Sequence, residues 1–390
     1  MGTPRSFLLP FIAGEMYHQP VSTEGPKYKQ ICQNLKTAIE SGTYGAGFRL
    51  PSEHELVQTF GASRVTVSRA LKELQIGGLI DRRAGSGTYV RASTVKQHAF
   101  GLLIPELGQT EIFEPICQGM VAAQEAHNHV LIWGRSLAGS ETTEADAKDV
   151  CARLISNRVS GVFFAPIEAN PQKDAINRII STMLSDAKIP IVLLDRDIVD
   201  YPQRSKFDVV GIDNRRAGCV ATQHLIDAGC RRIGFIGRPH LAPSCVARCN
   251  GYRETVSNSS IPLAPTFAER LDPSDPILVG KVMDRHKPDG IVCSNDRTAA
   301  LLMRTFATLK IAVPDQVRLV AFDDVKYASL VTVPLTTIHQ PCDQLGAAAI
   351  QAMVQRIESP DMPPRDILVD FHLVVRESCG ARMARDRSSS

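Results

Sequence analysis

The sequence lacks any long apolar stretch. No segment of its 390 residues approaches the roughly 20 consecutive apolar residues that a membrane-spanning helix needs. The nearest candidate, Phe7–Ala13, is short, is interrupted by Pro10, and follows a single basic residue, Arg5, so it does not resemble a secretion signal. We therefore interpret residues 1–25 as a disordered leader and expect a cytoplasmic protein with no membrane partner.

The ten cysteines also lack the spacing that chemistry requires. No two of them are separated by two residues, and no Cys/His cluster has the spacing of a zinc site. Cys219 and Cys293 lie in apolar runs, where a free cysteine behaves as a small hydrophobic residue. We expect reduced thiols, no bound metal and no cofactor.

Net charge is nearly absent as well. The chain has 44 lysines and arginines against 41 acids, a net charge of +3, which by itself argues against a nucleic-acid partner. The charge is unevenly distributed, however. Residues 26–92 hold ten lysines and arginines against five acids, whereas residues 93–390 are close to neutral. A basic N-terminal segment is compatible with nucleic-acid binding.

Two regions of the chain differ in periodicity. Residues 26–91 predict short helices followed by a hairpin, and residues 98–380 alternate strands with helices. The polar, non-periodic residues 92–97 predict a linker, and the Arg/Ser-rich residues 381–390 predict a disordered tail. We therefore expect a small N-terminal domain joined to a large C-terminal one.

The first region predicts a helix-turn-helix unit. A helix over Tyr28–Glu40 is followed by several glycines, and Ser52 then opens a capping box that starts a second helix ending near Gly61. Ser63 can cap a third helix, Arg64–Gln75. Two helices joined by a tight, glycine-containing turn are typical of the helix-turn-helix.

The third helix has an apolar and a basic face at 100° per residue. The residues expected in the core are Val67, Ala70, Leu71 and Leu74. The opposite face, with its flanks, carries Val65, Ser68, Arg69 and Lys72 together with Arg64 and Thr66. Such a basic face of small side chains suits the major groove of DNA, although an ordinary solvated helix surface has the same pattern.

The following hairpin favours DNA binding. Leu79–Arg83 and Thr88–Val90 predict two strands around a glycine-rich tip. Glycines allow such a tip to approach a phosphate or the floor of the minor groove, and Arg82 and Arg83 add positive charge.

The run RLPSEHELVQTFGASRVTVSRALKEL, followed by GGLI and RRAGSGTYV, resembles the GntR-type winged helix-turn-helix. The resemblance implies a winged α+β domain that binds double-stranded operator DNA. The implied DNA contacts are Arg49, Ser63, Arg64, Thr66 and Gly85. Where the family commonly has an arginine two residues after the threonine, this chain has Ser68, and Arg69 is the expected substitute.

The second region predicts buried parallel strands separated by helices. The strands are expected at Phe100–Ile104, Val130–Trp133, Gly161–Phe164, Ile189–Leu194, Val209–Ile212, Ile233–Ile236, Gly290–Cys293 and Leu319–Phe322. The helices include Ile116–His127, Ala145–Asn157, Arg215–Ala228, Thr298–Leu309 and Cys342–Ile357. Repeated βα units predict a doubly wound α/β architecture, and their number favours two subdomains facing across a cleft.

Polar residues are concentrated where these strands end. Asp195 and Arg196, Asn295, and Asp323 each follow an apolar run, and ligands of open α/β sheets bind at this edge. Carboxylates and amides can bridge adjacent hydroxyls, and arginine donates a planar fork, so such a set could bind a polyol. For three further acids, each just ahead of a predicted helix or turn, we favour a capping or turn role: Asp213, Asp296 and Asp324.

Several segments resemble the effector domain of the LacI/GalR family, itself similar to periplasmic sugar-binding proteins. They include LISNRVSGVFF, IPIVLLDRDI, VVGIDNRRAG, SNDR, and AFDD followed by VPLTTIHQP, and together they span nearly all of residues 98–376. The implied effector-binding residues are Phe113, Asp195, Arg196, Arg248, Asn295, Asp323 and Gln340. Phe113 would stack on the ligand, with a core phenylalanine as the alternative.

In place of the LacI-type headpiece the chain has the winged domain, a combination that resembles arabinose-repressor-type regulators. We therefore predict a homodimeric transcriptional regulator, most simply a repressor, whose operator binding is controlled by a monosaccharide in the cleft. A nucleobase or nucleoside in the same cleft is the first alternative.

Two other classes are less consistent with the sequence. A transport-type sugar-binding protein shares the large fold, but it requires a secretion signal and has no use for a winged helix. An enzyme would need reactive groups, and the chain has no nucleophile elbow, Walker motif, metal cluster or dinucleotide fingerprint.

Overall fold

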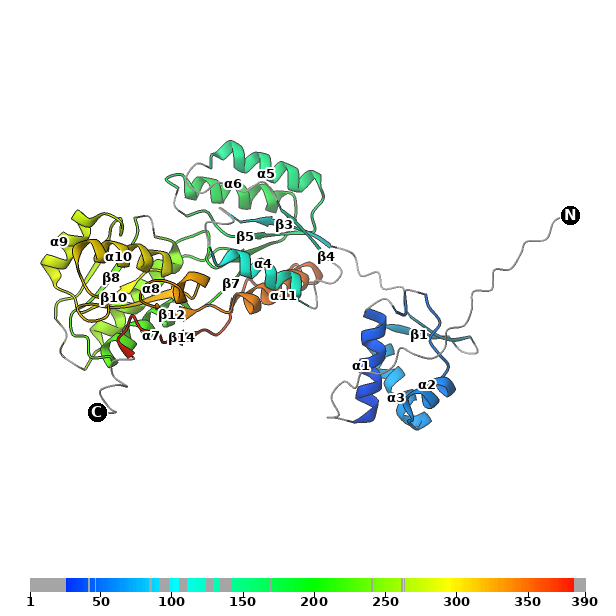
Figure 1. Cartoon of the computed structure of the whole chain (residues 1–390). Helices are drawn as coiled ribbons and strands as arrows, with labels where there is room; N and C mark the ends of the chain where they lie inside the picture. Colours follow the sequence, from blue (N-terminus) through cyan, green and yellow to red (C-terminus); the bar gives the residue numbers. More distant parts are fainter. Residues whose placement is uncertain are drawn as a thin grey trace, which may run out of the picture. The chain divides into compact units, whose positions relative to one another are not determined.

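The computed structural model describes residues 26–40, 43–45, 47–83, 86–90, 98–104, 111–123, 129–133, 142–168, 170–239, 241–260, 262 and 264–381. The chain forms two compact units, residues 1–96 and 97–390 (Figure 1). Over the described ranges, no helix is both long enough and apolar enough to span a bilayer.

The smaller unit contains three helices and a hairpin. Its elements are α1 (Lys27–Glu40), α2 (Glu53–Phe60), α3 (Arg64–Ile76), β1 (Ile80–Arg83) and β2 (Gly87–Val90). Ser52 forms the predicted capping box with Glu55 at the start of α2, and Ser63 accepts a hydrogen bond from the Thr66 amide at the start of α3. The predicted apolar face of α3 is buried in the core of this unit, where it packs with Ile31 and Leu35 of α1.

A third segment lies along the hairpin. β1 and β2 are antiparallel, with Ile80 opposite Val90. Arg49 forms a bridge with Tyr89, and the Leu50 amide donates a hydrogen bond to the Thr88 carbonyl. The segment before α2 therefore extends the wing, a pairing that the sequence pattern did not predict.

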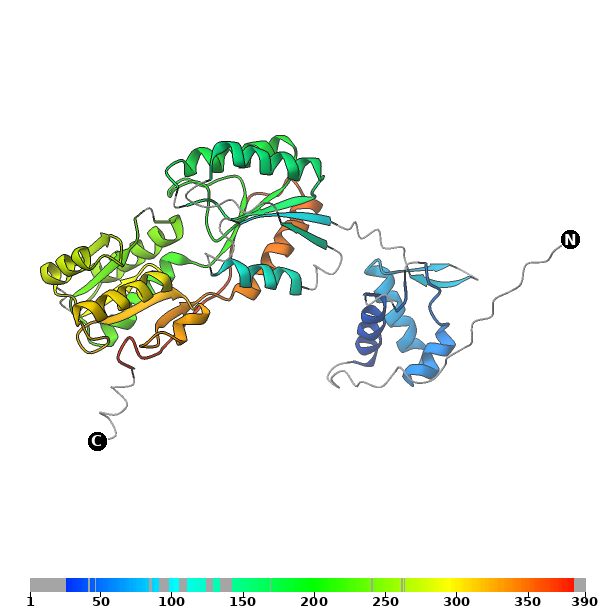
Figure 2. The ribbon, with the colours of Figure 1, turned by 45° about the horizontal axis from the view of Figure 1, so that its top comes forward.

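The larger unit consists of two lobes, each with a six-stranded sheet between two layers of helices (Figure 2). We call residues 98–211 and 342–368 lobe 1, and residues 214–339 and 372–381 lobe 2. Together the lobes confirm the predicted doubly wound α/β fold with two subdomains.

In lobe 1 the strand order is β13-β7-β6-β5-β3-β4, and every neighbouring pair is parallel. The strands are β3 (His98–Leu103), β4 (His129–Trp133), β5 (Gly161–Phe164), β6 (Ile191–Leu194), β7 (Asp208–Gly211) and β13 (Asp366–Leu368). The helices are α4 (Phe113–Ala122), α5 (Glu144–Ser156), α6 (Lys173–Asp186) and α11 (Cys342–Glu358).

Both faces of this sheet are covered, which explains why its strands are continuously apolar. Val192 and Leu194 belong to the core on the α4/α11 side, and Ile191 and Leu193 belong to the core on the α5/α6 side. Successive side chains of a strand point to opposite faces, so a strand buried on both sides has no polar positions.

In lobe 2 the order is β14-β12-β11-β10-β8-β9, and only β14 is antiparallel to its neighbour. The strands are β8 (Ile233–Gly237), β9 (Phe267–Arg270), β10 (Gly290–Cys293), β11 (Arg318–Asp323), β12 (Thr336–His339) and β14 (His372–Val374). The helices are α7 (Asn214–Asp227), α8 (Pro243–Ser257), α9 (Pro276–His286), α10 (Asp296–Leu309) and the short 3-10 helix η3 (Lys326–Ser329).

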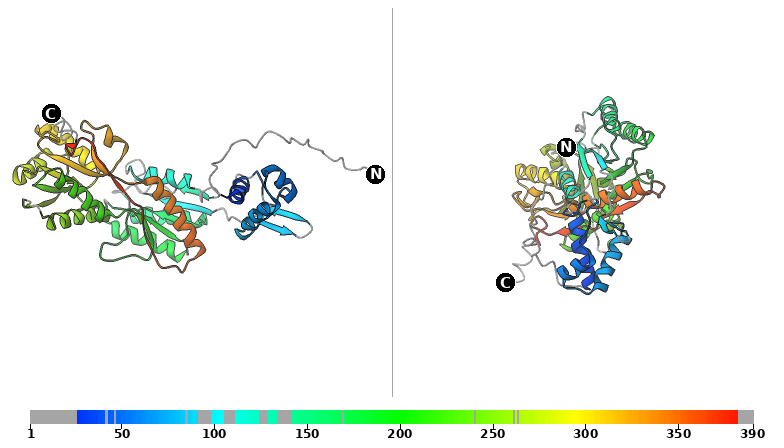
Figure 3. Two further views of the ribbon diagram at one scale, coloured as in Figure 1. Left: turned by 90° about the horizontal axis from the view of Figure 1, so that it is seen from below. Right: turned by 90° about the vertical axis from the view of Figure 1, so that its right-hand side faces the viewer.

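The chain passes between the lobes three times: between β7 and α7, between β12 and α11, and between β13 and β14. Helix α11 thus follows a strand of lobe 2 but packs in lobe 1 beside α4, as the left view of Figure 3 shows. These three short connections form the hinge around which the lobes can rotate.

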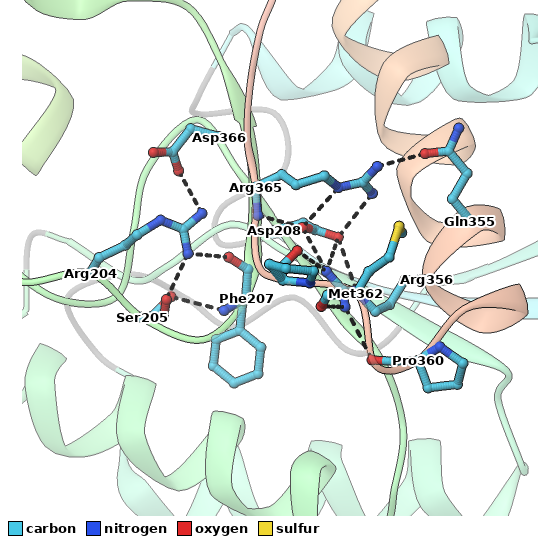
Figure 4. Close-up of polar contacts among 11 residues, drawn as sticks. Arg204, Ser205, Phe207, Asp208, Gln355, Arg356, Pro360, Met362, Arg365 and Asp366 are labelled. Atoms are coloured by element: carbon cyan, nitrogen blue, oxygen red, sulfur yellow. Dashed lines mark hydrogen bonds and ion pairs between the residues drawn. The ribbon is translucent and has the colours of Figure 1, made fainter.

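A buried carboxylate ties the far end of α11 to lobe 1. Asp208, at the start of β7, accepts hydrogen bonds from the Arg356 guanidinium of α11 and from the amide and guanidinium of Arg365 (Figure 4). Burial alone would raise the pKa of Asp208, but these hydrogen bonds outweigh it and lower the pKa. The cluster makes α11 move with lobe 1 when the hinge bends.

Close helix packing positions lobe 2 in a similar way. A Cβ at Gly218 of α7 would overlap the Arg248 carbonyl of α8, and one at Gly251 of α8 would overlap the Arg215 carbonyl of α7. Glycine at both positions lets the two backbones touch. The position of Arg248, a predicted ligand residue, therefore depends on this contact.

Candidate functional site

The exposed face of α3 presents the predicted DNA-contacting residues. Arg64 has 84% of its side chain exposed, and Val65 beside it is 79% exposed. The Arg64 Nε lies 3.3 Å from a carboxylate oxygen of Glu53 in α2, and Arg82 of the wing pairs with the same carboxylate. Glu53 therefore links α2, α3 and the wing, and it orients two arginines near the start of α3.

Arg49 lies against the wing. Gly87 has a φ of +123°, and a Cβ at this position would lie 2.8 Å from the Arg49 Nε. A glycine is thus required here both for the backbone conformation and for the space that Arg49 fills. The predicted wing contact, Gly85, falls outside the described residues.

The remaining predicted residues of this face differ in their availability. The Ser63 hydroxyl caps α3 and lies 2.8 Å from the Thr66 hydroxyl, so the two side chains form one polar pair. The guanidinium of Arg69 lies over the Tyr28 ring, 3.9 Å from its centroid. Arg69 therefore packs α3 against α1, a role that the expected substitution for a DNA-reading arginine at position 68 did not anticipate.

A cavity of about 100 Å³ in the larger unit brings together most of the predicted effector residues. Lobe 1 and lobe 2 each contribute three of them: Phe113, Asp195 and Arg196, and Arg248, Asn295 and Asp323. The seventh, Gln340, lines an adjoining pocket of about 460 Å³ that shares Asp323 with the first. The strand ends thus converge as the sequence predicts.

On the lobe 1 side, Arg196 holds Asp195. Its Nη1 donates to the Asp195 Oδ2 over 2.9 Å, and its Nε and Nη2 donate to the Pro166 carbonyl. The guanidinium also lies 5.7 Å from the centroid of the Phe113 ring, so Phe113 belongs both to the core and to the cavity wall. Asp195 has a φ of +69°, and its Oδ1 is buried without a hydrogen-bond partner among the described residues.

On the lobe 2 side, Arg248 holds Asp323. Its Nη2 lies 3.2 Å from the Asp323 Oδ1, while its Nε and Nη1 donate to Asn214 and to the Ser294 carbonyl. The Gln340 amide donates to the same Asp323 oxygen over 2.7 Å. Burial raises the pKa of Asp323 to about 6, although Arg248 and Gln340 act to lower it.

The acids that the sequence assigned to capping or turns have structural partners. Asp213 caps α7 through the Arg216 amide. Asp296 is buried and accepts hydrogen bonds from the Thr337 hydroxyl and the Val325 amide, so it joins α10 to two other segments. Asp324 pairs with His339 and Arg376.

Asn295 has a second role that the sequence analysis did not predict. Its amide oxygen caps α10 by accepting from the amide and the hydroxyl of Thr298, at 2.9 and 2.7 Å. Only its amide nitrogen is therefore available to donate into the cavity.

Five cavity residues were missed by the sequence analysis. The Ser244 hydroxyl of α8 donates to the Asp195 Oδ2 over 3.1 Å, which joins the two lobes directly. The others are charged side chains: Glu111, Glu168, Arg238 and Arg297. Ser244 begins the S…R..GY segment and Arg297 ends SNDR, so both lie inside motifs that were noticed for other residues.

Metal and thiol chemistry have no visible basis in this cavity. Over the described parts of the chain, no group of three or more His, Cys, Asp or Glu side chains could hold a metal ion. Burial raises the pKa of the Cys245 thiol, which lines the cavity, to about 12. This cysteine is therefore protonated and unreactive at neutral pH.

Comparison with known families identifies both parts of the chain. Residues 27–90 match the gntR family of bacterial regulatory proteins, and residues 222–379 match the periplasmic binding protein-like domain. The chain is therefore a DNA-binding transcriptional regulator that joins a GntR-type winged helix-turn-helix to a LacI/GalR-type domain. Over most of its length it is similar to the arabinose metabolism transcriptional repressor of Geobacillus stearothermophilus, with 28% identity over 367 residues, 90% of this chain and 97% of that protein.

Other relatives agree with this architecture. The regulator CelR of Thermobifida fusca is 27% identical over 331 residues, which cover 82% of this chain and 91% of CelR. Among solved structures, a CelR–cellobiose complex has a TM-score of 0.61 at 23% identity, over 81% of this chain and 90% of that one. A LacI family regulator from Enterococcus faecium with bound ribose has a TM-score of 0.59 at 20% identity, over 72% and 98% of the two chains. The named relatives are regulators, not enzymes.

Proposed function

We propose that this regulator is a repressor that leaves its operator when a small sugar, a monosaccharide in the simplest case, binds between lobes 1 and 2. The observation that carries this proposal is the buried Oδ1 of Asp195, a carboxylate oxygen in the cavity without a donor among the described residues. Since a buried acceptor without a partner costs free energy, a ligand hydroxyl that donates to it is stabilising. The sugars in the names and titles of relatives support the same ligand class.

The proposed effector contacts are the predicted set, now divided by role. Asp195 and Asp323 accept ligand hydroxyls from opposite lobes, Asn295 donates, and Phe113 supplies an apolar wall. Arg196 and Arg248 hold the two aspartates in position. A ligand that bonds to both lobes favours one hinge angle over the others, and this difference in affinity drives the change.

The proposed DNA contacts are Arg49, Ser63, Arg64 and Thr66 of the smaller unit, with Gly85 at the wing tip. A homodimer would present two such units to a palindromic operator in the cytoplasm. For dimerisation we favour the larger unit, where the edge strand β4 exposes Val130 and Trp133. An exposed apolar edge strand is a surface that a second copy could cover. Sedimentation velocity would detect the dimer.

The DNA-binding part is tested by changing Arg64. Duplexes that bind the full chain are selected from a random library, and the affinity of Arg64→Ala is measured on the selected sequence. We expect specific binding to fall by at least about tenfold while nonspecific affinity changes little. The control is Lys29→Ala, which removes an exposed charge from α1 of the same unit. Unchanged specific affinity in Arg64→Ala would exclude α3 as the reading helix.

The sensing part is tested with Asp323→Ala. A thermal-shift screen of pentoses, hexoses, their phosphates and nucleosides first identifies a ligand that stabilises the chain. We expect Asp323→Ala to keep DNA affinity but to lose release by that ligand. A variant that is still released would place the effector outside this cavity, and a nucleoside as the best ligand would replace the sugar in this proposal.

A further inference from the structure

The cavity between the lobes is lined by four arginines and four acids. Two of the arginines, Arg196 and Arg248, are buried and already bound by the protein. Arg196 donates to Asp195 and to a backbone carbonyl, and Arg248 pairs with Asp323 and donates to a side-chain amide and a backbone carbonyl. These two charges position the aspartates, so they are not available to a ligand anion.

The other two arginines, Arg238 and Arg297, are exposed side chains of lobe 2. Arg238 directly follows β8, and Arg297 lies in the first turn of α10, which follows β10. Since β8 and β10 are parallel neighbours, their C-terminal ends bring both guanidinium groups to the same edge of the sheet. Within the described ranges, neither arginine takes part in an ion pair.

The nearest acids of lobe 2 are engaged elsewhere. Asp272 is close enough to Arg238 to respond to its charge, but its carboxylate accepts hydrogen bonds from the amide and the hydroxyl of Ser274. Asp296 precedes Arg297 in sequence, but it is buried and bonds to β12 and to the segment after β11. The two guanidinium groups therefore add positive charge to this side of the cavity.

The place of Arg297 in α10 increases this positive charge. It is the second residue of the helix, and the macrodipole of a helix is positive at its N-terminus. A cation in this turn is unfavourable unless an anion lies nearby, and Asn295, which caps the helix, is neutral. An anion bound here would be attracted by both guanidinium groups and by the helix end.

We propose that the effector carries an anionic group, a phosphate or a carboxylate, which Arg238 and Arg297 bind while its hydroxyls bond to Asp195 and Asp323. This inference rests on the proposed function and adds the charge of the ligand to it. The effector is then a phosphorylated or oxidised sugar and not a neutral one.

The charges on the opposite wall fix the orientation of the ligand. Glu111 and Glu168, both of lobe 1, also line the cavity, and Glu168 lies 3.7 Å from Arg196. They repel an anion from the lobe 1 side, so the anionic group points toward lobe 2. On closure they could instead attract Arg238 and Arg297 across the cleft, and the experiment must separate this clamp from an anion site.

The test compares neutral and charged forms of one sugar by calorimetry with the full chain. Glucose is compared with glucose 6-phosphate and gluconate, and ribose with ribose 5-phosphate, with inorganic phosphate alone as a further probe. We expect a charged form to bind about tenfold or more tightly than its neutral counterpart. Comparing phosphate with carboxylate determines which anion the site prefers.

The variant R238Q/R297Q separates the two roles of the arginines. We expect it to lose the preference for the charged sugar and to keep the affinity for the neutral one. The matched control is Arg304→Gln, an exposed arginine on α10 that does not line the cavity. Equal affinity for neutral and charged sugars in the wild type would overturn the proposal. So would an equal loss for both forms in the variant, the result expected of a clamp. If no sugar of either charge binds, the proposed function fails, and this inference fails with it.

Discussion

The Ser244 hydroxyl of lobe 2 donates a hydrogen bond to the Asp195 Oδ2 of lobe 1 over 3.1 Å. Arg196 donates to the same oxygen, so both printed donors of this carboxylate meet on one side. The other oxygen, Oδ1, remains free for a ligand. One carboxylate thus serves both the contact between the lobes and the proposed recognition of an effector.

We therefore expect Ser244→Ala to destabilise the larger unit. Removing the hydroxyl leaves a buried carboxylate with one donor fewer, which costs about 1–3 kcal/mol. Urea denaturation followed by circular dichroism measures this loss. Ser257→Ala, at the exposed end of the same helix, is the control and should change stability by no more than about 0.5 kcal/mol. Equal stability of the two variants would show that the contact between the lobes contributes nothing.

Effector affinity should depend on pH through Asp323. Burial raises its pKa to about 6, and only the ionised carboxylate accepts hydrogen bonds at both oxygens. As the pH falls through 6 the carboxylate takes up a proton, so affinity should weaken about tenfold between pH 7.5 and pH 5. Titration calorimetry at several pH values measures the profile. Asp323→Asn should bind weakly with a flat profile, and a flat wild-type profile would contradict the role of this carboxylate.

Gly218→Ala should disturb the cavity from a distance. The added Cβ overlaps the Arg248 carbonyl, so α7 and α8 must separate, at a cost of about 1–3 kcal/mol. Because Arg248 holds Asp323, effector affinity should fall as well. The control is Gly280→Ala in α9, where a Cβ meets no atom within 4 Å and alanine favours the helix. The prediction is wrong if both variants unfold at the same temperature.

Asp208 should contribute stability that acid removes. Its hydrogen bonds to Arg356 and Arg365 lower its pKa, so its contribution is present above the unfolded value of about 3.9 and is lost as the pH falls through the lower folded value. Asp208→Ala leaves two arginines unpaired and should cost about 3–5 kcal/mol at neutral pH. In urea denaturation, the stability difference from the wild type should shrink below about pH 4.

The neighbouring acid Asp366 provides the control for Asp208. It pairs with Arg204 at 2.9 Å, but 58% of its side chain is exposed. Its replacement by alanine should cost less than about 1 kcal/mol. Similar losses in the two aspartate variants would show that burial does not set the strength of the Asp208 cluster.

DNA affinity should fall steeply with salt. Contacts to phosphates release counterions, so about six contacts in a dimer reduce the affinity about 10³-fold between 50 and 200 mM salt. Arg83→Ala at the wing should reduce the slope by about one for each protomer's contact and leave the preferred sequence unchanged. Fluorescence anisotropy with the selected duplex measures both quantities. A slope near zero would contradict binding through phosphates.

Local patterns were sufficient to predict the elements that are buried in a regular way. The four apolar residues of α3 recur at helical spacing, so their burial followed from the sequence. The inner strands are covered on both faces and stand out as apolar runs. The strands β13 and β14 have three residues each and no buried position, so their pairing depends on the completed lobes.

Contacts between distant segments could not be predicted in the same way. The match between Arg49 and Gly87 requires the segment before α2 to lie along the wing. Ser244 reaches Asp195 only because the two lobes meet, and Arg69 turns toward Tyr28 only because α1 packs beside α3. For these residues the type of side chain was visible in the sequence, but its partner was not.

The three passages of the chain between the lobes have a consequence for biosynthesis. Strand β13 completes the sheet of lobe 1 and strand β14 that of lobe 2, and both follow residue 365. The ribosome has made the whole winged unit by residue 90, but neither sheet of the sensor until the chain is nearly finished. A nonsense mutation after α11 would therefore leave the DNA-reading part intact and remove an edge strand from both lobes at once. Such an allele would produce a repressor fragment that the inducer cannot control.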